Sequence, residues 1–410
     1  MLTKLLWMIP AVVLTCQASS ASADVITDWN EKSIALVTPR MTPPAAQRAV
    51  AIVQLAMFDA VNSIERRYRP YMIQLPGTAT MSAEAAAVAA AGVALTGLVP
   101  QAQKEIKSAV DDSLAAIADS DAKRTGIALG EAVAARVLEV RAADGAAAAD
   151  AYRPKTKAGV YVPTPITVGS TWPSLKPFAM TSPAQFRPQP PIALASAQWA
   201  ADYNEIKDLG GRTSSKRSAK QTEDARFWLI TGPQSTDPIA RQLVAAKKMP
   251  LIDSARFMAL AAVALADAYV SVMEAKYHYE FWRPITAIRN GDSDDNPATE
   301  RDAAWQPIDN TPMHPEYPCA HCIGSAALAA VIEAMFGSAE IPAVAMTSAT
   351  APGVTHRWTN VRAYTDEVSD ARIWAGFHYR FSTRVGQEMG RKIGQYVARN
   401  VMQPVGAATR

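Results

Sequence analysis

Apolar residues that recur every three or four positions constrain the fold of this chain more than any other sequence feature. After Pro43 this spacing is followed by Val50, Val53, Met57, Val61 and Ile64. It places the apolar side chains on one face of an α-helix, which has to end before Pro70. Runs of alternating β-branched residues are nearly absent. The pattern therefore predicts an all-α fold.

The same periodicity, or a high alanine content, marks further helices along the chain. They cover residues 82–98, 101–117 and 123–143, and later segments start near residue 195 and cover 222–230, 254–282, 318–336 and most of 366–399. Alanine is the best helix former and lets helix axes approach closely. We therefore expect helical bundles, without an internal repeat of fixed period.

One long segment interrupts this pattern. Residues 152–191 are rich in proline, threonine, serine and aromatic residues and show no sustained period. Loops of this length are commonly functional or link two parts of a chain. We expect a signal peptide over residues 1–23, an N-terminal helical bundle with a long irregular Pro-rich connection over 24–190, and a C-terminal helical bundle over 191–410.

The N-terminus has the order of regions found in secretory signal peptides. An apolar run over residues 5–14 follows a single lysine and leads to Ala21-Ser22-Ala23, which predicts cleavage before Asp24. The apolar run is too short to span a bilayer. A lipid anchor at Cys16 is the less favoured alternative, because Thr15 precedes it. We expect a periplasmic or secreted protein with no membrane span.

Charge and cysteine content argue against two classes of protein. The 41 basic and 38 acidic residues are spread along the chain, so no nucleic-acid partner is expected. One of the three cysteines lies in the predicted signal peptide, and the local pair Cys319 and Cys322 cannot staple a disulfide-rich scaffold.

All histidines lie in the C-terminal half of the chain, as His278, His314, His321, His356 and His378. Histidine titrates near neutral pH and is a common metal ligand, so this cluster marks where chemistry is expected. A single histidine is nevertheless more often structural than catalytic. The choice among the five therefore rests on spacing and on neighbouring residues.

Two basic residues form the first motif. Lys276 and Arg283 are almost two helical turns apart, so their side chains leave the same helix face. Pro284 disfavours helix at Arg283 and so places its guanidinium at a helix end, where it can turn into a cavity. The residues between them are mostly aromatic, which favours burial over a solvated basic face.

The second motif leads into a helix. Residues 314–322 contain two prolines and run into an alanine-rich helix that stops near Gly337. Free backbone N–H groups and the helix dipole make the start of such a helix an anion site. His321 lies in the first turn, where the dipole lowers its proton affinity and suits it to general acid–base catalysis. A helix start capped by chance is the structural alternative.

Arg372 and His378 form the third motif, with Gly376 between them. On an unbroken helix the two side chains would diverge by about 120°. A glycine permits a break or a close backbone approach that would bring them together. Taken alone, this spacing says little about function.

Taken in order, Lys-x6-Arg-Pro, Pro-x-x-His and Arg-x5-His resemble the superfamily of vanadium-dependent haloperoxidases and type 2 phosphatidic acid phosphatases. The family pattern reads Lys-x6-Arg-Pro, Pro-Ser-Gly-His and Ser-Arg-x5-His-x3-Asp. The resemblance is close over residues 276–382, and the upstream context looks like the soluble exported bacterial haloperoxidase branch, which is all-α with two bundles. It implies vanadate as cofactor.

The resemblance implies which groups bind the oxyanion. Lys276, Arg283 and Arg372 would donate to its oxygens, together with the backbone of Ala320 and the side chain of Cys319. Cys319 replaces the family serine and is a weaker hydrogen-bond donor. Ala320 replaces the family glycine, which is a small steric change.

The resemblance implies catalytic roles as well. His378 would be the ligand to vanadium in a peroxidase or the nucleophile in a phosphatase, and His321 would be the general acid and base. Lys276 would help His321 to activate peroxide. His314 occupies a position beside the metal in this superfamily, although an exposed loop histidine is an equal alternative. Ser382 stands where the family has an aspartate that orients the ligand histidine, so that carboxylate is missing at that place.

Four hypotheses follow. The leading one is a vanadate-dependent haloperoxidase that uses hydrogen peroxide to oxidise halide, with an organic acceptor as a further substrate. A soluble exported acid phosphatase of the same superfamily, acting on phosphate esters, is the second. A thiol redox protein that uses Cys319 and Cys322 at a helix N-terminus is a minor alternative. A helical binding protein that retains the pocket without turnover is the last.

Overall fold

The computed structural model describes residues 24–406 of the 410-residue chain. The signal peptide over 1–23, its cleavage and the anchor at Cys16 therefore fall on residues outside this range and stay predictions. Within the described part the protein is mostly helical, with thirteen α-helices and one two-stranded sheet. The predicted helical fold class is confirmed.

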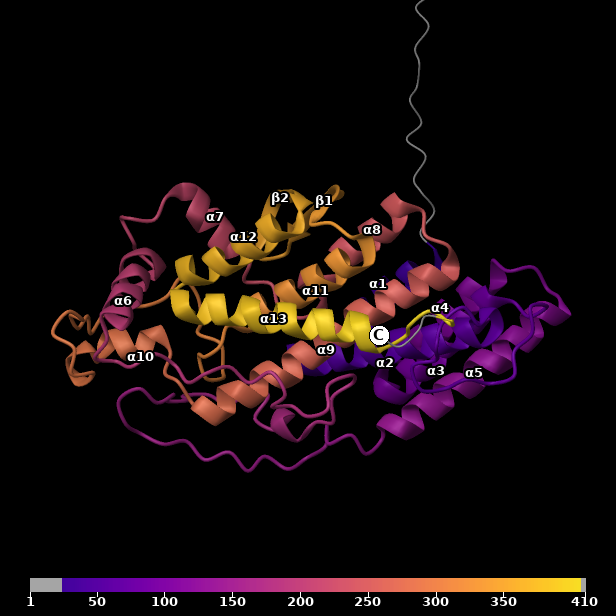
Figure 1. Ribbon diagram of the computed structural model, residues 1–410, viewed down its shortest axis with the longest axis horizontal. Helices are drawn as coiled ribbons and strands as arrows, with labels where there is room; N and C mark the ends of the chain where they lie inside the picture. Colours follow the sequence, from indigo (N-terminus) through magenta and orange to yellow (C-terminus); the bar gives the residue numbers. More distant parts are fainter. Residues whose placement is uncertain (1–23, 407–410) are drawn as a thin grey trace, which may run out of the picture.

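Five helices form one end of the molecule (Figure 1). They are α1 (Val25–Val37), α2 (Pro43–Glu65), α3 (Ala83–Leu98), α4 (Gln103–Ala115) and α5 (Asp121–Arg141). Ser82 and Ser120 cap the N-termini of α3 and α5 by accepting a backbone N–H of the first turn. α3 and α5 pack closely because a Cβ on Gly130 would lie 2.1 Å from the Ala86 carbonyl oxygen.

α9 (Leu251–Tyr279) runs through the centre of the molecule, with α2, α11 (Ala320–Phe336) and α13 (Arg380–Asn400) packed against it (Figure 1). In the described part it is the one helix long and apolar enough to cross a membrane, yet its whole apolar window is buried inside the protein. One continuous cluster of buried apolar side chains extends from α1 to α13. The helices on either side of residue 190 thus share a core, and the division there stays a prediction.

The Pro-rich connection is irregular, as its composition indicates. Between α5 and α6 (Ala197–Gly210) the described chain forms only the 3-10 turn Trp172–Ser174. Asp267 of α9 holds this segment by accepting the backbone N–H groups of residues 178, 179 and 180 at 2.6, 2.8 and 2.9 Å. These three hydrogen bonds fix the Pro-rich connection to the central helix α9.

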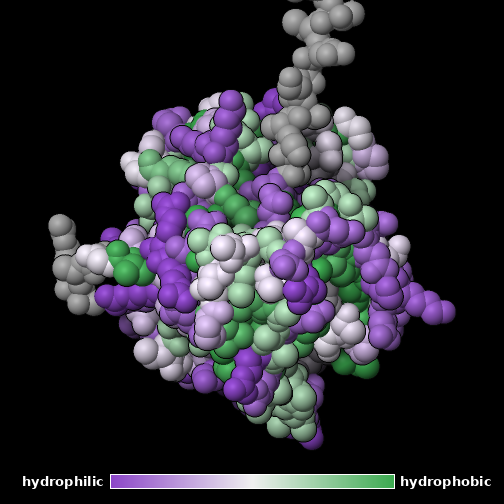
Figure 2. Space-filling model, turned by 90° about the vertical axis from the view of Figure 1, so that its right-hand side faces the viewer, coloured by the Kyte–Doolittle hydropathy of each residue, from purple (hydrophilic) through white to green (hydrophobic). Residues whose placement is uncertain are grey.

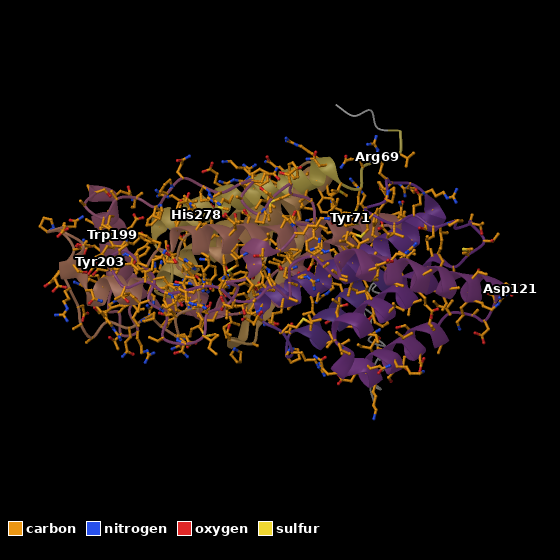
Figure 3. The ribbon with its side chains drawn as sticks, turned by 90° about the horizontal axis from the view of Figure 1, so that it is seen from below. Arg69, Tyr71, Asp121, Trp199, Tyr203 and His278 are labelled. Carbon is orange, nitrogen blue, oxygen red and sulfur yellow. A yellow bond between two sulfur atoms is a disulfide. The ribbon has the colours of Figure 1, made fainter. Side chains whose placement is uncertain are left out.

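The remaining helices are α7 (Ala219–Phe227), α8 (Asp237–Lys247), α10 (Pro284–Arg289) and α12 (Val361–Trp374). Of these, α8 lies near α1, and the others lie towards the end of the molecule that carries α6 (Figure 1). Trp199 and Tyr203 of α6 mark this end and Asp121 of α5 the opposite one (Figure 3). On the surface of the end that carries α3 to α5, hydrophilic and hydrophobic residues are mixed (Figure 2). This agrees with α4, where Ile106 alone is buried among the residues of that helix.

Two features differ from the sequence-based prediction. Strands β1 (Glu340–Ser348) and β2 (Ala351–Asn360) form an antiparallel hairpin that the sequence pattern did not predict. The alternation of buried and exposed residues along the two strands is obscured because the pairing register shifts twice. The helix expected over 366–399 is two helices, α12 and α13. Gly376 separates them at φ +79°, and a Cβ there would lie 2.5 Å from the Gly210 carbonyl oxygen.

Candidate oxyanion site

The three motifs meet at one cavity. Its volume is about 1030 Å³. The predicted site residues that line it are Arg283, His314, Ala320, His321, Arg372 and His378. They come from the N-cap of α10, from α11 and α12, from the turn between α12 and α13, and from the loop before α11. Tyr161 and Val168 of the Pro-rich connection also line it, so this loop contributes to the site.

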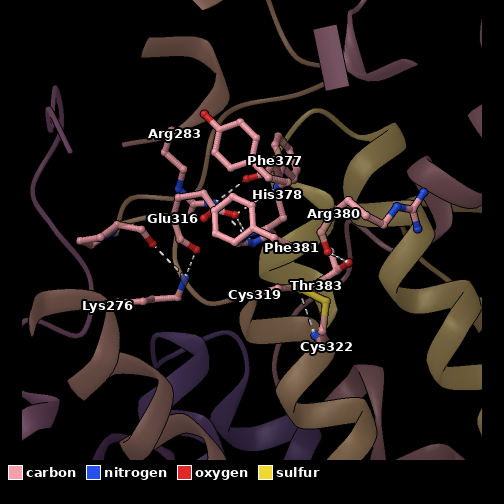
Figure 4. A network of polar contacts seen from close by, with 12 residues as sticks. Lys276, Arg283, Glu316, Cys319, Cys322, Phe377, His378, Arg380, Phe381 and Thr383 are labelled. Atoms are coloured by element: carbon pink, nitrogen blue, oxygen red, sulfur yellow. Dashed lines mark hydrogen bonds and ion pairs between the residues drawn. A yellow bond between two sulfur atoms is a disulfide. The ribbon is translucent and has the colours of Figure 1, made fainter. Parts of the chain in front are cut away.

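Arg283 connects the motifs through its guanidinium (Figure 4). It is the N-cap residue of α10 and fully buried, as the following proline predicts. Its Nε donates to the His314 carbonyl at 2.9 Å and its Nη1 to the Phe377 carbonyl at 3.0 Å. Nη1 also lies 3.4 Å from His378 Nε2, and Nη2 lies 3.0 Å from His314 Nδ1. One guanidinium thus places both histidines at the cavity.

Lys276 is fully buried in the last turn of α9. Its Nζ donates to the carbonyl oxygens of Pro315 and Glu316 at 2.8 and 2.6 Å. Burial, followed by the charge of Arg283, lowers the pKa of Lys276 well below its ordinary value. The Nζ group therefore fixes the loop before α11 beside the cavity, although it does not line the cavity itself.

Arg372 is a second buried guanidinium, 1% exposed. Its Nη1 donates to the Trp228 carbonyl, and the group lies 4.8 Å from the centre of the Phe377 ring. Its Nε has no hydrogen-bond partner among the described residues. Burial and then the charge of Arg283 lower the pKa of Arg372 to about 9. Burial lowers that of Arg283 to about 10, with Glu316 opposing.

His378 is held by a carboxylate that sequence reasoning missed. Its Nδ1 lies 2.7 Å from Oε1 of Glu316, which also accepts the Tyr379 backbone N–H at 3.3 Å (Figure 4). Burial and then the charge of Arg283 lower the pKa of His378 well below its ordinary value, so the ring is neutral. Since Nδ1 donates to Glu316, the lone pair of the neutral ring is on Nε2, and Arg283 Nη1 makes only a long contact of 3.4 Å with this nitrogen.

The sequence suggested that His378 lacks its carboxylate partner because Ser382 stands where the family has an aspartate. The structure shows that Glu316 provides this carboxylate instead. Burial raises the pKa of Glu316 to about 7, although Lys276 and Arg283 oppose this. Ser382 is fully buried and lies close enough to Glu316 to oppose the shift as well. The signal for Glu316 was present in the sequence, as an acidic residue between the two prolines of segment 314–322.

His321 lies in the first turn of α11, partly open to the cavity. Its Nε2 is 2.9 Å from the Ile230 carbonyl, which can only accept, so Nε2 carries the proton and Nδ1 is free. Burial and then the charge of Arg372 lower the pKa of His321 well below its ordinary value. A neutral imidazole with one free nitrogen can accept a proton at neutral pH.

Cys319 does not have the environment expected of an oxyanion donor. It forms a disulfide with Cys322, so it has no S–H group, and it does not line the cavity. Its sulfur instead accepts the Cys322 backbone N–H at 3.2 Å as N-cap of α11. Both sulfurs are fully buried, so a thiol exchange partner cannot reach them, and the redox alternative loses support. Ala320, by contrast, presents the helix start to the cavity.

The other two histidines lie away from this site. His278 is exposed near the end of α9, and His356 belongs to β2. His314 is beside the cavity, as the resemblance implies, and burial followed by the charge of Lys276 lowers its pKa well below the ordinary value.

Comparisons with known proteins agree with this geometry. Residues 256–407 match the family model of the VCPO second helical-bundle domain. The vanadium chloroperoxidase of Curvularia inaequalis is 28% identical over 174 residues, which are 34% of this chain and 28% of that protein. Residues 256–407 are thus similar to the second helical-bundle domain of vanadium chloroperoxidases. The match spans under a third of the length of that curated relative.

Solved structures of superfamily members share the fold over nearly the whole chain. A bacterial vanadium-dependent iodoperoxidase superposes with a TM-score of 0.78 at 24% identity and covers 92% of this chain and 96% of its own. A bacterial vanadium-dependent chloroperoxidase in its holo form has a TM-score of 0.72 at 15% identity, with 90% and 94% covered. The helices outside residues 256–407 thus have the same fold as these structures.

Proposed function

We propose that this protein is a vanadate-dependent haloperoxidase, which oxidises halide with hydrogen peroxide and passes the oxidised halogen to water or an organic acceptor. One observation supports it most. Lys276, Arg283 and Arg372 are buried cations around a single nearby carboxylate, Glu316, in the described chain. Buried charge without a partner is costly, so this cluster requires an anion.

The donor set fits vanadate. Arg372 keeps an unpartnered Nε, the start of α11 presents backbone N–H groups, and His378 offers a neutral Nε2. Arg283, Arg372 and the backbone at Ala320 would hold the oxygens and His378 the metal, while Lys276 would act from beside the cavity. When bound, vanadate supplies Lewis-acid activation of hydrogen peroxide.

The protein's own residues supply orientation and proton transfer. Glu316 holds the His378 ring through Nδ1, which leaves Nε2 towards the cavity, 3.4 Å from Arg283 Nη1. His321 accepts a proton at Nδ1, because its Nε2–H stays bound to the Ile230 carbonyl. The adjacent cationic charge of Arg372 then favours return of that proton from an imidazolium.

Two variants test the assignment. His378→Ala removes the proposed covalent link to vanadium, so we expect vanadate affinity to fall sharply. His321→Ala leaves the ligand and the cations in place, so binding survives while peroxidase turnover falls by roughly 10²–10⁴-fold. Calorimetric titration of vanadate, with halide oxidation measured in parallel, separates the two. Equal binding by wild type and His378→Ala would refute the ligand assignment.

A soluble acid phosphatase is the second candidate. The Glu316–His378 hydrogen bond favours it, because it supplies the carboxylate that a nucleophilic histidine needs. Phosphate shares the charge and shape of vanadate, so the same residues would bind a phosphate ester. Hydrolysis of a phosphate monoester by vanadate-free protein, lost in His378→Ala and inhibited by vanadate, would favour this function over the first.

We also propose that the protein is periplasmic or secreted. The signal-peptide pattern over residues 1–23 supports this, and so does the Cys319–Cys322 disulfide, because disulfides persist in oxidising compartments. Recovery of a mature N-terminus at Asp24 in the exported fraction tests it. An intact N-terminus in the membrane fraction would overturn it.

A further inference from the structure

A second group of titratable side chains lies where α7, β2 and α12 meet, away from the oxyanion cavity (Figure 1). Its centre is His356 of β2, which is 6% exposed. The imidazole stacks on the ring of Phe227, the last residue of α7, at 3.9 Å and an interplanar angle of 4°. Its orientation is therefore fixed by packing.

Glu367 of α12 determines which nitrogen of His356 carries the proton. Its Oε1 lies 2.5 Å from His356 Nδ1 and accepts Trp228 Nε1 at 3.0 Å, and its Oε2 accepts Trp358 Nε1 at 2.9 Å. A carboxylate that accepts two indole N–H groups accepts from Nδ1 as well, so Nδ1 carries a proton.

The other nitrogen of His356 points at two carboxylates. Nε2 lies 3.5 Å from Asp224 Oδ1 and 3.7 Å from Glu223 Oε1, and it has no hydrogen-bond partner among the residues described. These distances exceed the roughly 2.7–3.2 Å of an N–H···O hydrogen bond. Three potential ligand atoms, from His356, Asp224 and Glu223, thus lie within 4.8 Å of one another without a hydrogen bond from Nε2 to either carboxylate.

The spacing matches a metal ion better than a hydrogen bond. Tetrahedral bonds of about 2.0–2.1 Å place neighbouring ligand atoms about 3.3–3.4 Å apart. The observed separations from Nε2, 3.5 and 3.7 Å, reach this value after shifts of a few tenths of an ångström. Lys220 now contacts both carboxylates, but its side chain is 64% exposed and can move into solvent.

We propose that His356, Asp224 and Glu223 bind Zn²⁺ or a similar divalent transition-metal ion, with Glu367 as the residue that orients His356. The nitrogen ligand disfavours Ca²⁺ and Mg²⁺, which prefer oxygen. A histidine ligand whose second nitrogen donates to a carboxylate is the usual arrangement in zinc sites. Glu223, with 42% of its side chain exposed, leaves a route for the ion and for water as a fourth ligand.

The position of this site gives it a consequence for the oxyanion cavity. The chain that follows α7 supplies the Trp228 carbonyl to Arg372 and the Ile230 carbonyl to His321. A metal that joins β2 to α7 fixes the start of this segment. The ion would therefore stabilise the contacts of Arg372 and His321 with this segment without contacting the substrates. The metal site does not depend on which reaction occurs in the cavity.

The test uses the full mature chain without a histidine tag, freed of metal by a chelator. We expect calorimetry to give one Zn²⁺ site, and Co²⁺ to give the visible absorption of a tetrahedral complex. His356→Gln and Asp224→Asn should each weaken Zn²⁺ binding at least roughly tenfold, and Glu367→Gln roughly 10- to 100-fold. The control His278→Gln removes an exposed histidine on α9 and should leave binding unchanged.

Three results would overturn the proposal. The first is no Zn²⁺ binding by the wild type above that of His356→Gln. The second is equal loss in His278→Gln, which indicates adventitious surface binding. The third is Ca²⁺ binding that survives His356→Gln, which indicates a site made by carboxylates only. If circular dichroism shows that His356→Gln does not fold, the partly exposed Glu223→Gln replaces it and should weaken binding by the same factor.

Discussion

Replacing Arg372 by methionine separates the stability of this protein from its function. The change removes a buried charge but keeps an unbranched side chain of similar length. The pKa of Arg372 falls to about 9 in the folded protein, and at about 1.36 kcal/mol per pH unit this corresponds to a destabilisation of at most about 5 kcal/mol. The wild type carries this cost whenever no anion is bound.

The substitution also removes favourable contacts. The Trp228 carbonyl loses its donor, which costs about 1–3 kcal/mol, and the contact of the cation with the Phe377 ring is worth about 0.5–2 kcal/mol. The difference leaves Arg372→Met equal to the wild type or more stable by up to about 3 kcal/mol in anion-free buffer. Urea unfolding of the vanadate-free protein measures it.

Vanadate affinity should change in the opposite direction. Hydrogen bonds from a charged donor contribute about 1.5–3 kcal/mol, so their loss weakens binding by roughly 10- to 150-fold. Arg256→Met is the matched control, because Arg256 is also buried, donates to the Met402 carbonyl at 2.7 Å and lies 4.6 Å from the Tyr68 ring. It does not line the cavity. A large loss of stability in Arg372→Met with unchanged vanadate affinity would show that Arg372 is only structural.

Three further predictions concern the carboxylate and the disulfide. Burial raises the pKa of Glu316 to about 7, so its ionised form is lost as pH falls through 7. Because the ionised form keeps the proton on His378 Nδ1, vanadate affinity should fall over the same pH range. Glu316→Gln should abolish this dependence, because an amide oxygen accepts at every pH; an unchanged pH profile contradicts the role. The double variant Glu316→Ser/Ser382→Asp moves the carboxylate from the loop to α13 and should preserve vanadate binding. Ser382→Asp alone places two carboxylates close together and should lower the midpoint of thermal unfolding. Cys319→Ser should keep peroxidase activity, since serine is also a good N-cap; loss of activity in the folded variant would instead assign a role to the disulfide.

The helices were predictable because their signals are local. The run after Pro43 becomes α2, and the segment 254–282 becomes α9, whose bounds are Leu251–Tyr279. A helix break at Gly376 was considered, because glycine adopts positive φ readily, but the helical pattern over 366–399 favoured a single helix. α1 and α8 were missed, and so was the hairpin, where Pro342 and Pro352 stand inside the strands and irregular pairing hides the two-residue period.

The cations and histidines around the cavity were predictable for another reason, since their motifs follow one another in a fixed order. Arg283, Arg372, His321 and His378 do lie together. The partner of His378 was missed, because the acidic residue between Pro315 and Pro318 does not by itself indicate a hydrogen bond to a residue 62 positions away. The disulfide of Cys319 was left open for a similar reason, as a pair of cysteines in one helical turn is compatible with thiols and with a bond.

The carboxylate of Glu316 takes the role that the resemblance assigns to an aspartate at the position of Ser382, so the carboxylate partner of His378 is moved rather than lost. Both side chains are fully buried beside His378, and Glu316 already accepts the His378 Nδ1–H at 2.7 Å. A second carboxylate at position 382 would add a like charge at short range and raise one pKa strongly. Because Lys276 donates to the carbonyl of Glu316, the loop before α11 holds both the carboxylate and the ammonium in place. The histidine can thus be oriented from the loop instead of from α13, while the charge balance of the cavity stays the same.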